Sequence, residues 1–231
     1  MSTNLAQQLR EGTTKSHSMA ENVSFVKSFL GGVVDKKSYR QLLANLFFVY
    51  TAMEEEIEKN KSHIAVQAIY FPELYRKESL MQDLEYYYGK DWLQYIEPSS
   101  ATQVYVDRIY SIGKNQPELL ISHAYTRYIG DLSGGQILKK IAQNAMQLSE
   151  NIGTSFYDFK DIKDEKLFKQ IYRNSLNNIP LESNQINQII AEANTAFNLN
   201  MKIFQELNSN FIKIMVMLLL GSINNLRKKF S

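Results

Sequence analysis

Apolar residues recur with the period of an α-helix along almost the whole chain. In residues 36–59 they mark one helical face, which consists of Leu42, Leu43, Leu46, Val49, Tyr50, Met53 and Ile57. The same period predicts helices over residues 5–30, 36–59, 73–89, 99–113, 117–147, 164–178, 183–208 and 209–226. The first of these is expected to bend near Gly12. We find no convincing strand pattern, so the sequence predicts an all-α fold.

Proline positions agree with these helix borders. The prolines are Pro72, Pro98, Pro117 and Pro180, and each stands at a predicted border or in a loop. The loops are short, and the sequence contains neither a repeat nor a low-complexity linker. We therefore expect residues 1–231 to form a single helical domain.

Glycines interrupt the predicted helix over residues 117–147. A glycine inside a helix costs about 1 kcal/mol relative to alanine, so several of them together need an explanation. Gly130 and Gly134 are four residues apart and share a face, which lets a flat or bulky object approach the backbone closely. Asp131 and Ser133 place polar groups in the same turns. A kink or a helix crossing without any ligand is the alternative explanation.

One histidine has the surroundings of a metal ligand. Arg10, His17 and Glu21 share one helical face, and Glu21, one turn after His17, can orient the imidazole and raise its basicity. His63 stands in a loop-like stretch, and His123 has no acid within a helical turn. His17 is therefore the best candidate for an axial ligand among the three.

Polar residues also interrupt the apolar stripes. Tyr50 and Asn200 stand among apolar positions, where a buried polar group satisfied by a neighbour is the common explanation. Lys169 and Arg173 share a helical face, which is either solvated or able to receive two carboxylates. Together with the histidine and the glycines, these residues indicate a flat ligand that carries carboxylates and a metal. Heme has each of these properties.

Composition narrows the chemistry. The sequence contains no cysteine, which excludes disulfides, thiolate metal ligands and cysteine nucleophiles. The net charge is +2 with acids and bases interspersed, so no basic stripe indicates nucleic acid as a partner. The N-terminal residues lack the apolar core of a signal peptide.

The apolar run at residues 211–220 is the one segment that suggests a membrane. A spanning helix needs about 20 apolar residues, so we expect a soluble protein without a transmembrane anchor. We expect residues 210–231 to form a C-terminal packing helix. The alternative is a peripheral membrane foot whose basic end, Arg227, Lys228 and Lys229, contacts anionic lipid.

Several long segments resemble the heme oxygenase family. They are LREGTTKSHSMAENVSFVKSFLGG, YFPELYRKESLMQDLEYYYG, ELLISHAYTRYIGDLSGGQILKKIAQNAM, FKQIYRNSLN and EANTAFNLNMKIFQEL. The resemblance covers about residues 4–208 and is strongest to the soluble heme oxygenases of cyanobacteria and red-algal plastids. It implies a helical fold in which heme lies between a proximal helix and a kinked distal helix.

The resemblance also implies roles for individual residues. His17 corresponds to the proximal iron ligand with Glu21 as its hydrogen-bond partner, and Asp131 corresponds to the distal acid that organises water. Gly130 and Gly134 correspond to the glycines that touch the heme face. The residues facing the propionates are Arg10, Tyr125, Lys169 and Arg173. The distal network comprises Tyr50, Thr126, Arg127, Tyr128 and Asn200, and Phe197 corresponds to a pocket wall. Nothing is carried onto Leu148–Lys163.

The function implied by the resemblance is cleavage of heme at the α-meso carbon to biliverdin IXα, CO and ferrous iron. Heme is then both substrate and cofactor, O₂ is consumed, and electrons come from outside, most simply from ferredoxin in bilin pigment synthesis. Lys15, Lys139 and Lys140 are candidates for contacting an acidic donor. The implied location is the plastid stroma or the cyanobacterial cytoplasm.

Two other functions compete with this one. A non-catalytic heme-binding or transfer protein would use the same cavity and leave the heme intact. A di-iron helical bundle would need paired Glu-x-x-His motifs, which the sequence lacks.

Overall fold

The computed structural model of the chain describes residues 4–149 and 152–229, with side chains as far as residue 207. Every regular element in these ranges is helical, as the all-α prediction requires. The α-helices are α1 (Leu5–Gly12), α2 (Thr14–Glu21), α3 (Ser24–Leu30), α4 (Lys36–Lys59), α5 (Ile64–Gln67), α6 (Lys77–Tyr88), α7 (Ser100–Asn115), α8 (Leu120–Ala124), α9 (Gly130–Met146), α10 (Glu165–Asn177) and α11 (Ser183–Lys229). Short 3₁₀ turns occur at Pro72–Leu74, Trp92–Tyr95, Pro117–Leu119 and Ser155–Tyr157, and a π-helical turn spans Tyr125–Ile129.

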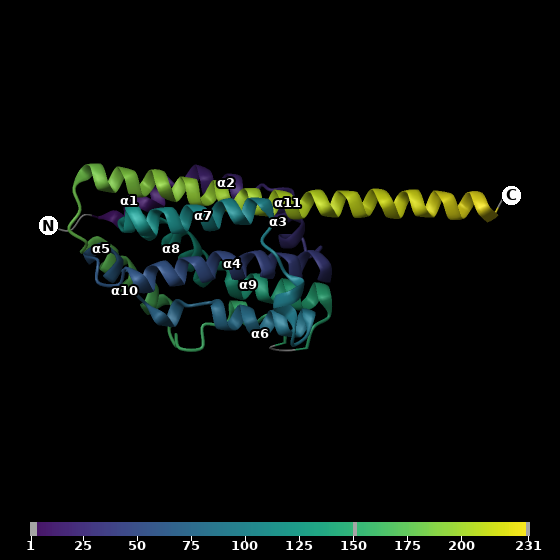
Figure 1. Ribbon diagram of the computed structural model, residues 1–231, viewed down its shortest axis with the longest axis horizontal. Helices are drawn as coiled ribbons and strands as arrows, with labels where there is room; N and C mark the ends of the chain where they lie inside the picture. The colour runs from purple at the N-terminus through teal and green to yellow at the C-terminus, as the bar shows by residue number, and fades with distance from the viewer. Residues whose placement is uncertain (1–3, 150–151, 230–231) are drawn as a thin grey trace.

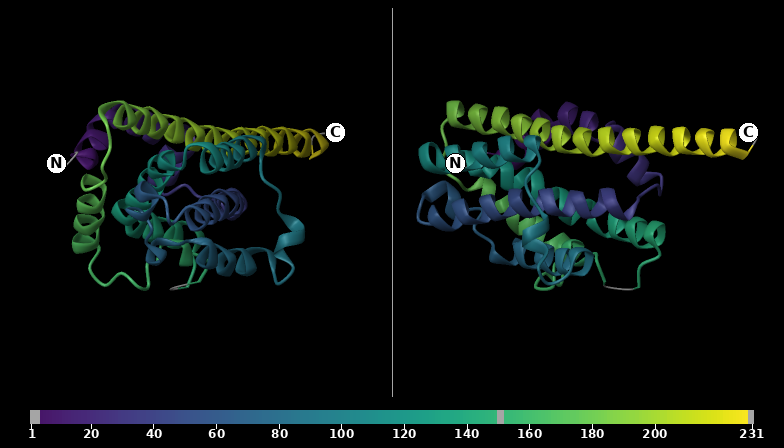
Figure 2. Two further views of the ribbon diagram at one scale, coloured as in Figure 1. Left: turned by 60° about the vertical axis from the view of Figure 1, so that its left-hand side comes forward. Right: turned by 45° about the vertical axis from the view of Figure 1, so that its right-hand side comes forward.

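Helix α4 is the central element of the fold. It packs between α6 on one side and α7 on the other (Figure 1). Helix α11 lies along α7, and it also contacts α1, α2 and α3, which are the purple helices beside it in Figure 2. The first three helices are thereby held against the rest of the molecule by α11.

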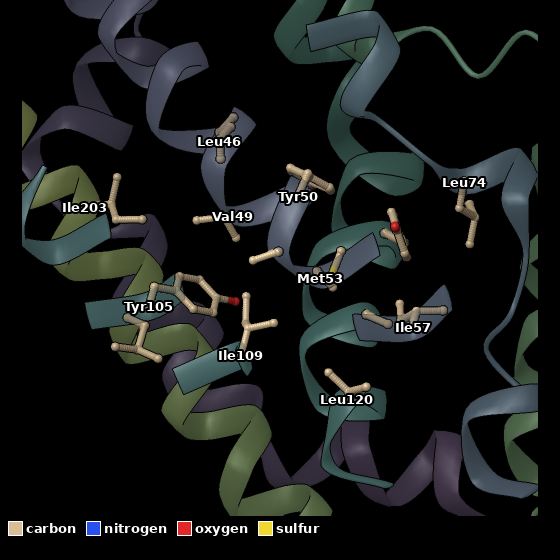
Figure 3. Close-up of a cluster of buried hydrophobic side chains, with 14 of the residues drawn as sticks. Leu46, Val49, Tyr50, Met53, Ile57, Leu74, Tyr105, Ile109, Leu120 and Ile203 are labelled. Carbon is tan, nitrogen blue, oxygen red and sulfur yellow. The ribbon is translucent and has the colours of Figure 1, made fainter. Parts of the chain in front are cut away.

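The core forms around α4. Figure 3 shows its buried side chains Leu46, Val49, Tyr50, Met53 and Ile57 in one cluster with Tyr105 and Ile109 of α7, Leu120 of α8 and Ile203 of α11. These α4 residues are among the apolar positions that the helical period selects, so the apolar face predicted for residues 36–59 is the face that is buried.

Side-chain caps explain where several helices begin. Asp35, Ser99 and Asp164 each accept a hydrogen bond from the backbone N–H three residues later, at the starts of α4, α7 and α10. The helices predicted over 36–59, 99–113 and 164–178 are confirmed within two residues at each end. The one predicted over 73–89 begins instead with a 3₁₀ turn and continues as α6.

The helix predicted over residues 5–30 is wrong in its continuity. Three helices replace it, with breaks at Thr13 and at Asn22–Val23. The Thr13 hydroxyl donates to the Leu9 carbonyl at 2.7 Å, a side-chain bond that competes with helix continuation. Gly12 is explained by packing, because a Cβ there would come within 2.5 Å of Ile190 Cγ2. It lets α11 pass close to the first helix.

The C-terminal region also differs from the prediction. The expected border between residues 208 and 209 is absent, and α11 runs without a break past the ends of the other helices (Figure 1). The predicted packing of residues 210–231 concerns side chains outside the described part of the structure and stays a prediction. Within the described ranges, none of the helices has the length and apolar character that crossing a bilayer demands.

A buried carboxylate joins α4 to the start of α6. Glu54 accepts hydrogen bonds from the backbone N–H of Arg76 at 2.6 Å and of Lys77 at 3.3 Å, and Tyr128 donates to it at 3.4 Å. Burial raises the pKa of Glu54 to about 7, although these donors and the charge of Arg76 act in the opposite direction.

This pKa predicts a pH-dependent cost to stability. A carboxyl with a higher pKa in the folded than in the unfolded chain costs nothing well below pH 4.5, and its full cost appears above about pH 7. We expect Glu54→Gln to remove this dependence. The free energy of unfolding of the variant, relative to that of wild type, should therefore be higher at pH 8 than at pH 4.5 by up to about 3 kcal/mol. Urea unfolding at both pH values measures the gain. An equal difference between the two proteins at both pH values would contradict the assignment.

Candidate functional site

A cavity of about 530 Å³ opens between the first two helices and the segment that leads into α9. Its walls come from α1, α2, the π-helical turn, α9, α10 and α11. The residues that line it are Ala6, Arg10, Thr13, Thr14, His17, Tyr125, Thr126, Ile129, Gly130, Ser133, Arg173 and Phe197. Residues from both ends of the sequence and from its middle thus meet around one space.

His17 projects from α2 into this cavity. Its Nδ1 lies 3.6 Å from Glu21 Oε1, one turn later on the same helix, and its ring meets the Phe197 ring edge-on at 5.8 Å. The carboxylate is on the Nδ1 side, so the Nε2 side of the imidazole stays available for a ligand. This is the arrangement that the spacing of His17 and Glu21 predicts.

The other two histidines do not reach the cavity. His63 accepts a hydrogen bond from the Ala65 N–H at 3.3 Å and caps α5. His123 is fully buried, with Nε2 at 2.9 Å from Glu192 and Nδ1 at 3.2 Å from the Tyr105 hydroxyl. The sequence shows no acid near His123 within its own helix, and in the folded chain α11 supplies one.

Two glycines leave the backbone of α9 open. A Cβ built on Gly130 or on Gly134 would meet no atom within 4 Å, whereas one on Gly135 would lie 3.5 Å from the Tyr157 ring. Gly130 has ordinary α-helical backbone angles. The irregular element is instead the π-helical turn at Tyr125–Ile129, directly before it. The open space at the two glycines agrees with the expected close approach of a ligand, which stays a prediction, and the π-helical turn supplies the irregularity.

A polar network lies behind this surface. The Tyr50 hydroxyl donates a short hydrogen bond to Asp131 Oδ2. Arg127 donates from Nε to the Tyr50 hydroxyl at 3.0 Å and from Nη1 to Asn200 Oδ1 at 2.8 Å, and its Nη2 lies 3.5 Å from Asp131 Oδ1. Four of the residues implied by the resemblance thus form one cluster from α4, the π-helical turn, α9 and α11.

The network continues to the surface through residues that sequence reasoning missed. Asn200 Nδ2 donates to the Tyr105 hydroxyl at 3.4 Å, and Tyr105 contacts His123. Glu192 then joins His123 to Arg108, whose side chain is 39% exposed. Burial alone would raise the pKa of Glu192, but hydrogen bonds from His123 and Arg108 lower it to about 2. No spacing in the sequence relates these residues, which come from three different helices.

Asp131 is a carboxyl in an apolar setting. Burial raises its pKa, and the charge of Arg127 and the Tyr50 hydrogen bond only partly oppose this effect. Asp131, Arg127 and Gly130 share a second cavity of about 150 Å³. Its other lining residues are Phe25, Val26, Phe29, Leu42, Leu46, Leu138, Phe156, Tyr157 and Phe204. Gly130 borders both cavities, so it stands between the histidine side and the carboxyl side.

Two arginines supply positive charge to the main cavity. Arg10 and Arg173 line it, and the charges of both lower the pKa of Tyr125, against the larger effect of burial, which raises it. Lys169 stands one turn before Arg173 on α10, but the cavity wall does not include it. Of these two cations, which the sequence treats as a pair, Arg173 is the one that lines the cavity.

The structure also places three other residues with predicted roles, Thr126, Tyr128 and Lys139. Thr126 lines the cavity and donates to the Ser122 carbonyl at 2.7 Å. Tyr128 donates its hydroxyl to Glu54, and its ring packs against that of Tyr50, a member of the polar network. Lys139 is a wrong choice for a surface that receives a partner, because it is buried and bonded to both Asp158 oxygens at 2.7 and 2.8 Å.

A sequence profile, two sequence relatives and a solved structure that resemble this chain all belong to one family. The sequence profile of the family described as heme oxygenase matches residues 3–206. A heme oxygenase of Porphyra purpurea is 64% identical over 99% of this chain and 97% of its own length, and heme oxygenase 1 of Synechocystis is 57% identical over 100% and 96%. The crystal structure of the Synechocystis heme oxygenase-1 in complex with heme superimposes with a TM-score of 0.91 at 58% identity, covering 95% of this chain and 99% of that one.

The open backbone at Gly134 gives a prediction with a matched control. Gly134→Ala and Gly135→Ala should each stabilise α9 by about 0.5 to 1 kcal/mol in the free protein, since neither new methyl group meets a close contact. Only Gly134→Ala should weaken heme binding, by roughly tenfold or more, because its methyl group enters open space on the helix face shared with Gly130, which lines the cavity. Thermal unfolding and heme titration measure the two effects. Equal heme affinity of both variants would show that Gly134 does not face the ligand.

Proposed function

The chain belongs to the heme oxygenase family, and from this premise we propose that it cleaves heme at the α-meso carbon to biliverdin IXα, CO and ferrous iron. The observation that carries the proposal is the single cavity that brings together His17, Gly130 and Arg173. A ligating nitrogen, an open backbone and a cation meet there, and heme needs all three.

The residues around the cavity fit heme. His17 would hold the iron through Nε2, with Glu21 orienting the ring through Nδ1. Gly130 and Gly134 have the room in front of them that a flat ring requires. Arg10 and Arg173 would bind the two propionates, and Phe197 holds the imidazole in place. Bound heme supplies the iron that activates O₂ and the ring carbon that becomes oxidised.

The protein contributes control of protons on the Asp131 side. Burial raises the pKa of Asp131, so this carboxyl carries a proton at a higher pH than an exposed aspartate does. Tyr50 holds Oδ2, and Arg127 fixes Tyr50 from the other side. Asp131 would then orient a water in the second cavity and pass a proton through it. Apart from Arg127 and Asp131, the lining of that cavity is mostly apolar, which leaves few other groups that could hold a water.

The proposal also includes the source of the electrons and the cellular location of the protein. The chain would receive electrons from an acidic donor such as reduced ferredoxin, at a surface that includes the exposed Lys15 and Lys140. The relatives from Porphyra purpurea and Synechocystis support a place in bilin pigment synthesis, in the plastid stroma or the cyanobacterial cytoplasm.

Turnover of the heme complex tests the function. Reduced ferredoxin, regenerated by its reductase, is added to the complex in air. Loss of the heme absorption band, with release of CO and of biliverdin as the α-isomer alone, is the expected result. A complex whose heme stays intact and passes to apomyoglobin would overturn the proposal in favour of a heme carrier.

Asp131→Asn should separate binding from turnover. The amide keeps the shape and accepts the Tyr50 hydrogen bond, so heme affinity should stay within about twofold. Ring opening should fall by roughly 100-fold, a usual loss for a missing acid–base group. The exposed Asp107→Asn serves as the control and should behave as wild type. Undiminished biliverdin formation by Asp131→Asn would exclude the proton role.

The two cations on α10 should differ in their effect on the product. Arg173→Glu places a negative charge in the cavity wall, where it repels a propionate and turns the ring in its plane. Lys169→Glu lies outside that wall and should act weakly. Chromatography of the biliverdin isomers should therefore show other isomers with Arg173→Glu and mostly the α-isomer with Lys169→Glu. The opposite ranking would mean that Lys169 is the cation that holds the propionate.

A further inference from the structure

The segment Gly153–Phe159 has two sets of partners. On one side it is bound by Asp83 of α6 and by Arg76, the residue before α6. On the other side it contacts Gln136 of α9. We propose, on the basis of the proposed function, that Asp83 and Arg76 are positioning residues for the acid side of the site. They hold this segment in place, and the segment in turn holds Tyr50 and α9.

Asp83 binds the segment through two consecutive amides. Its Oδ1 accepts from the Ser155 N–H and its Oδ2 from the Phe156 N–H, both at 2.8 Å. Asp83 is fully buried. Buried backbone N–H groups need acceptors, and a carboxylate is the strongest acceptor that a side chain offers. A single side chain therefore fixes the position of the Phe156 backbone.

Arg76 holds the carbonyl side of the same segment. Its Nη1 donates to the Asp158 carbonyl at 2.6 Å, and its guanidinium lies 3.8 Å from the centre of the Phe159 ring. Its own backbone N–H donates to Glu54 of α4. Arg76 thus connects the segment to the helix that carries Tyr50.

The segment then contacts the site at two places. The Phe156 ring packs edge-on against the Tyr50 ring, with 5.6 Å between their centres. Tyr157 accepts a hydrogen bond at its carbonyl from Gln136 of α9 at 2.9 Å, and its ring lies against Gly135. Because Tyr50 donates directly to Asp131, a shift of Phe156 changes the direction of that hydroxyl and hence the orientation of the carboxyl.

The main cavity meets these contacts only indirectly, through α9. None of its lining residues comes from α6 or from the segment, whereas Phe156 and Tyr157 both line the second cavity beside Asp131. A defect in the segment should therefore spare heme binding and impair the proton chemistry. This separation distinguishes a positioning role from a general contribution to folding.

The experiment compares Asp83→Asn with Asp35→Ala. Asp35 also accepts a backbone N–H, at the start of α4, so its loss controls for a general loss of stability without removing an acceptor of the segment. In the heme-free proteins, amide hydrogen exchange at Ser155 and Phe156 should speed up at least tenfold in Asp83→Asn alone. The ring resonances of a selectively labelled Tyr50 should shift in the same variant and stay in place in Asp35→Ala.

Turnover completes the test. In Asp83→Asn, kcat should fall at least tenfold while heme affinity stays within about twofold, and Asp35→Ala should leave both unchanged. Phe156→Leu removes the ring contact but keeps the amides that Asp83 binds, so it should reproduce the loss of kcat even where Asp83→Asn folds poorly.

Two results would overturn the proposal. One is an unshifted Tyr50 resonance in Asp83→Asn and Phe156→Leu. The other is an equal loss of kcat in Asp35→Ala. If the wild-type protein does not open heme at all, the proposed function fails, and exchange and the Tyr50 resonances still decide whether the segment positions Tyr50.

Discussion

The largely buried guanidinium of Arg127 sets the arrangement of the site. Arg127 must find acceptors for its N–H groups, because an unpaired buried charge costs several kcal/mol. It finds them in Tyr50 of α4, Asp131 of α9 and Asn200 of α11. These helices are far apart in the sequence and meet only in the folded chain, so satisfying this one side chain fixes their relative positions. The carboxyl that would handle protons is oriented by the same requirement.

Much of the fold could be predicted because apolar periodicity and capping residues act locally. Helix α4 follows its apolar face and begins at the Asp35 cap, as α7 begins at Ser99. The contact between His17 and Glu21 could be predicted for the same reason, because both residues belong to one helix. The breaks at Thr13 and within Tyr125–Ile129 were not predictable from apolar spacing, because hydroxyl bonding and a π-helical turn leave that spacing almost unchanged.

The parts of the site that escaped the sequence are those built across helices. His123 and Glu192 lie 69 positions apart, and their contact exists only because α8 and α11 pack together. From the sequence Lys139 is expected to be a surface charge, but in the folded chain it donates to Asp158. The segment around Phe156 carries no motif, yet it lines the cavity next to Asp131. Family resemblance implies which residues face the ligand, and the folded structure shows which neighbours support them.

The π-helical turn at Tyr125–Ile129 has a consequence for how this gene can change. One extra residue is accommodated in that turn, and each residue of an α-helix rotates the chain after it by about 100°. Deleting a single codon there would restore a regular helix and rotate Gly130 and the residues after it relative to those before the turn. A substitution in this region therefore changes one side chain, whereas a change of its length redirects every side chain of the helix that follows.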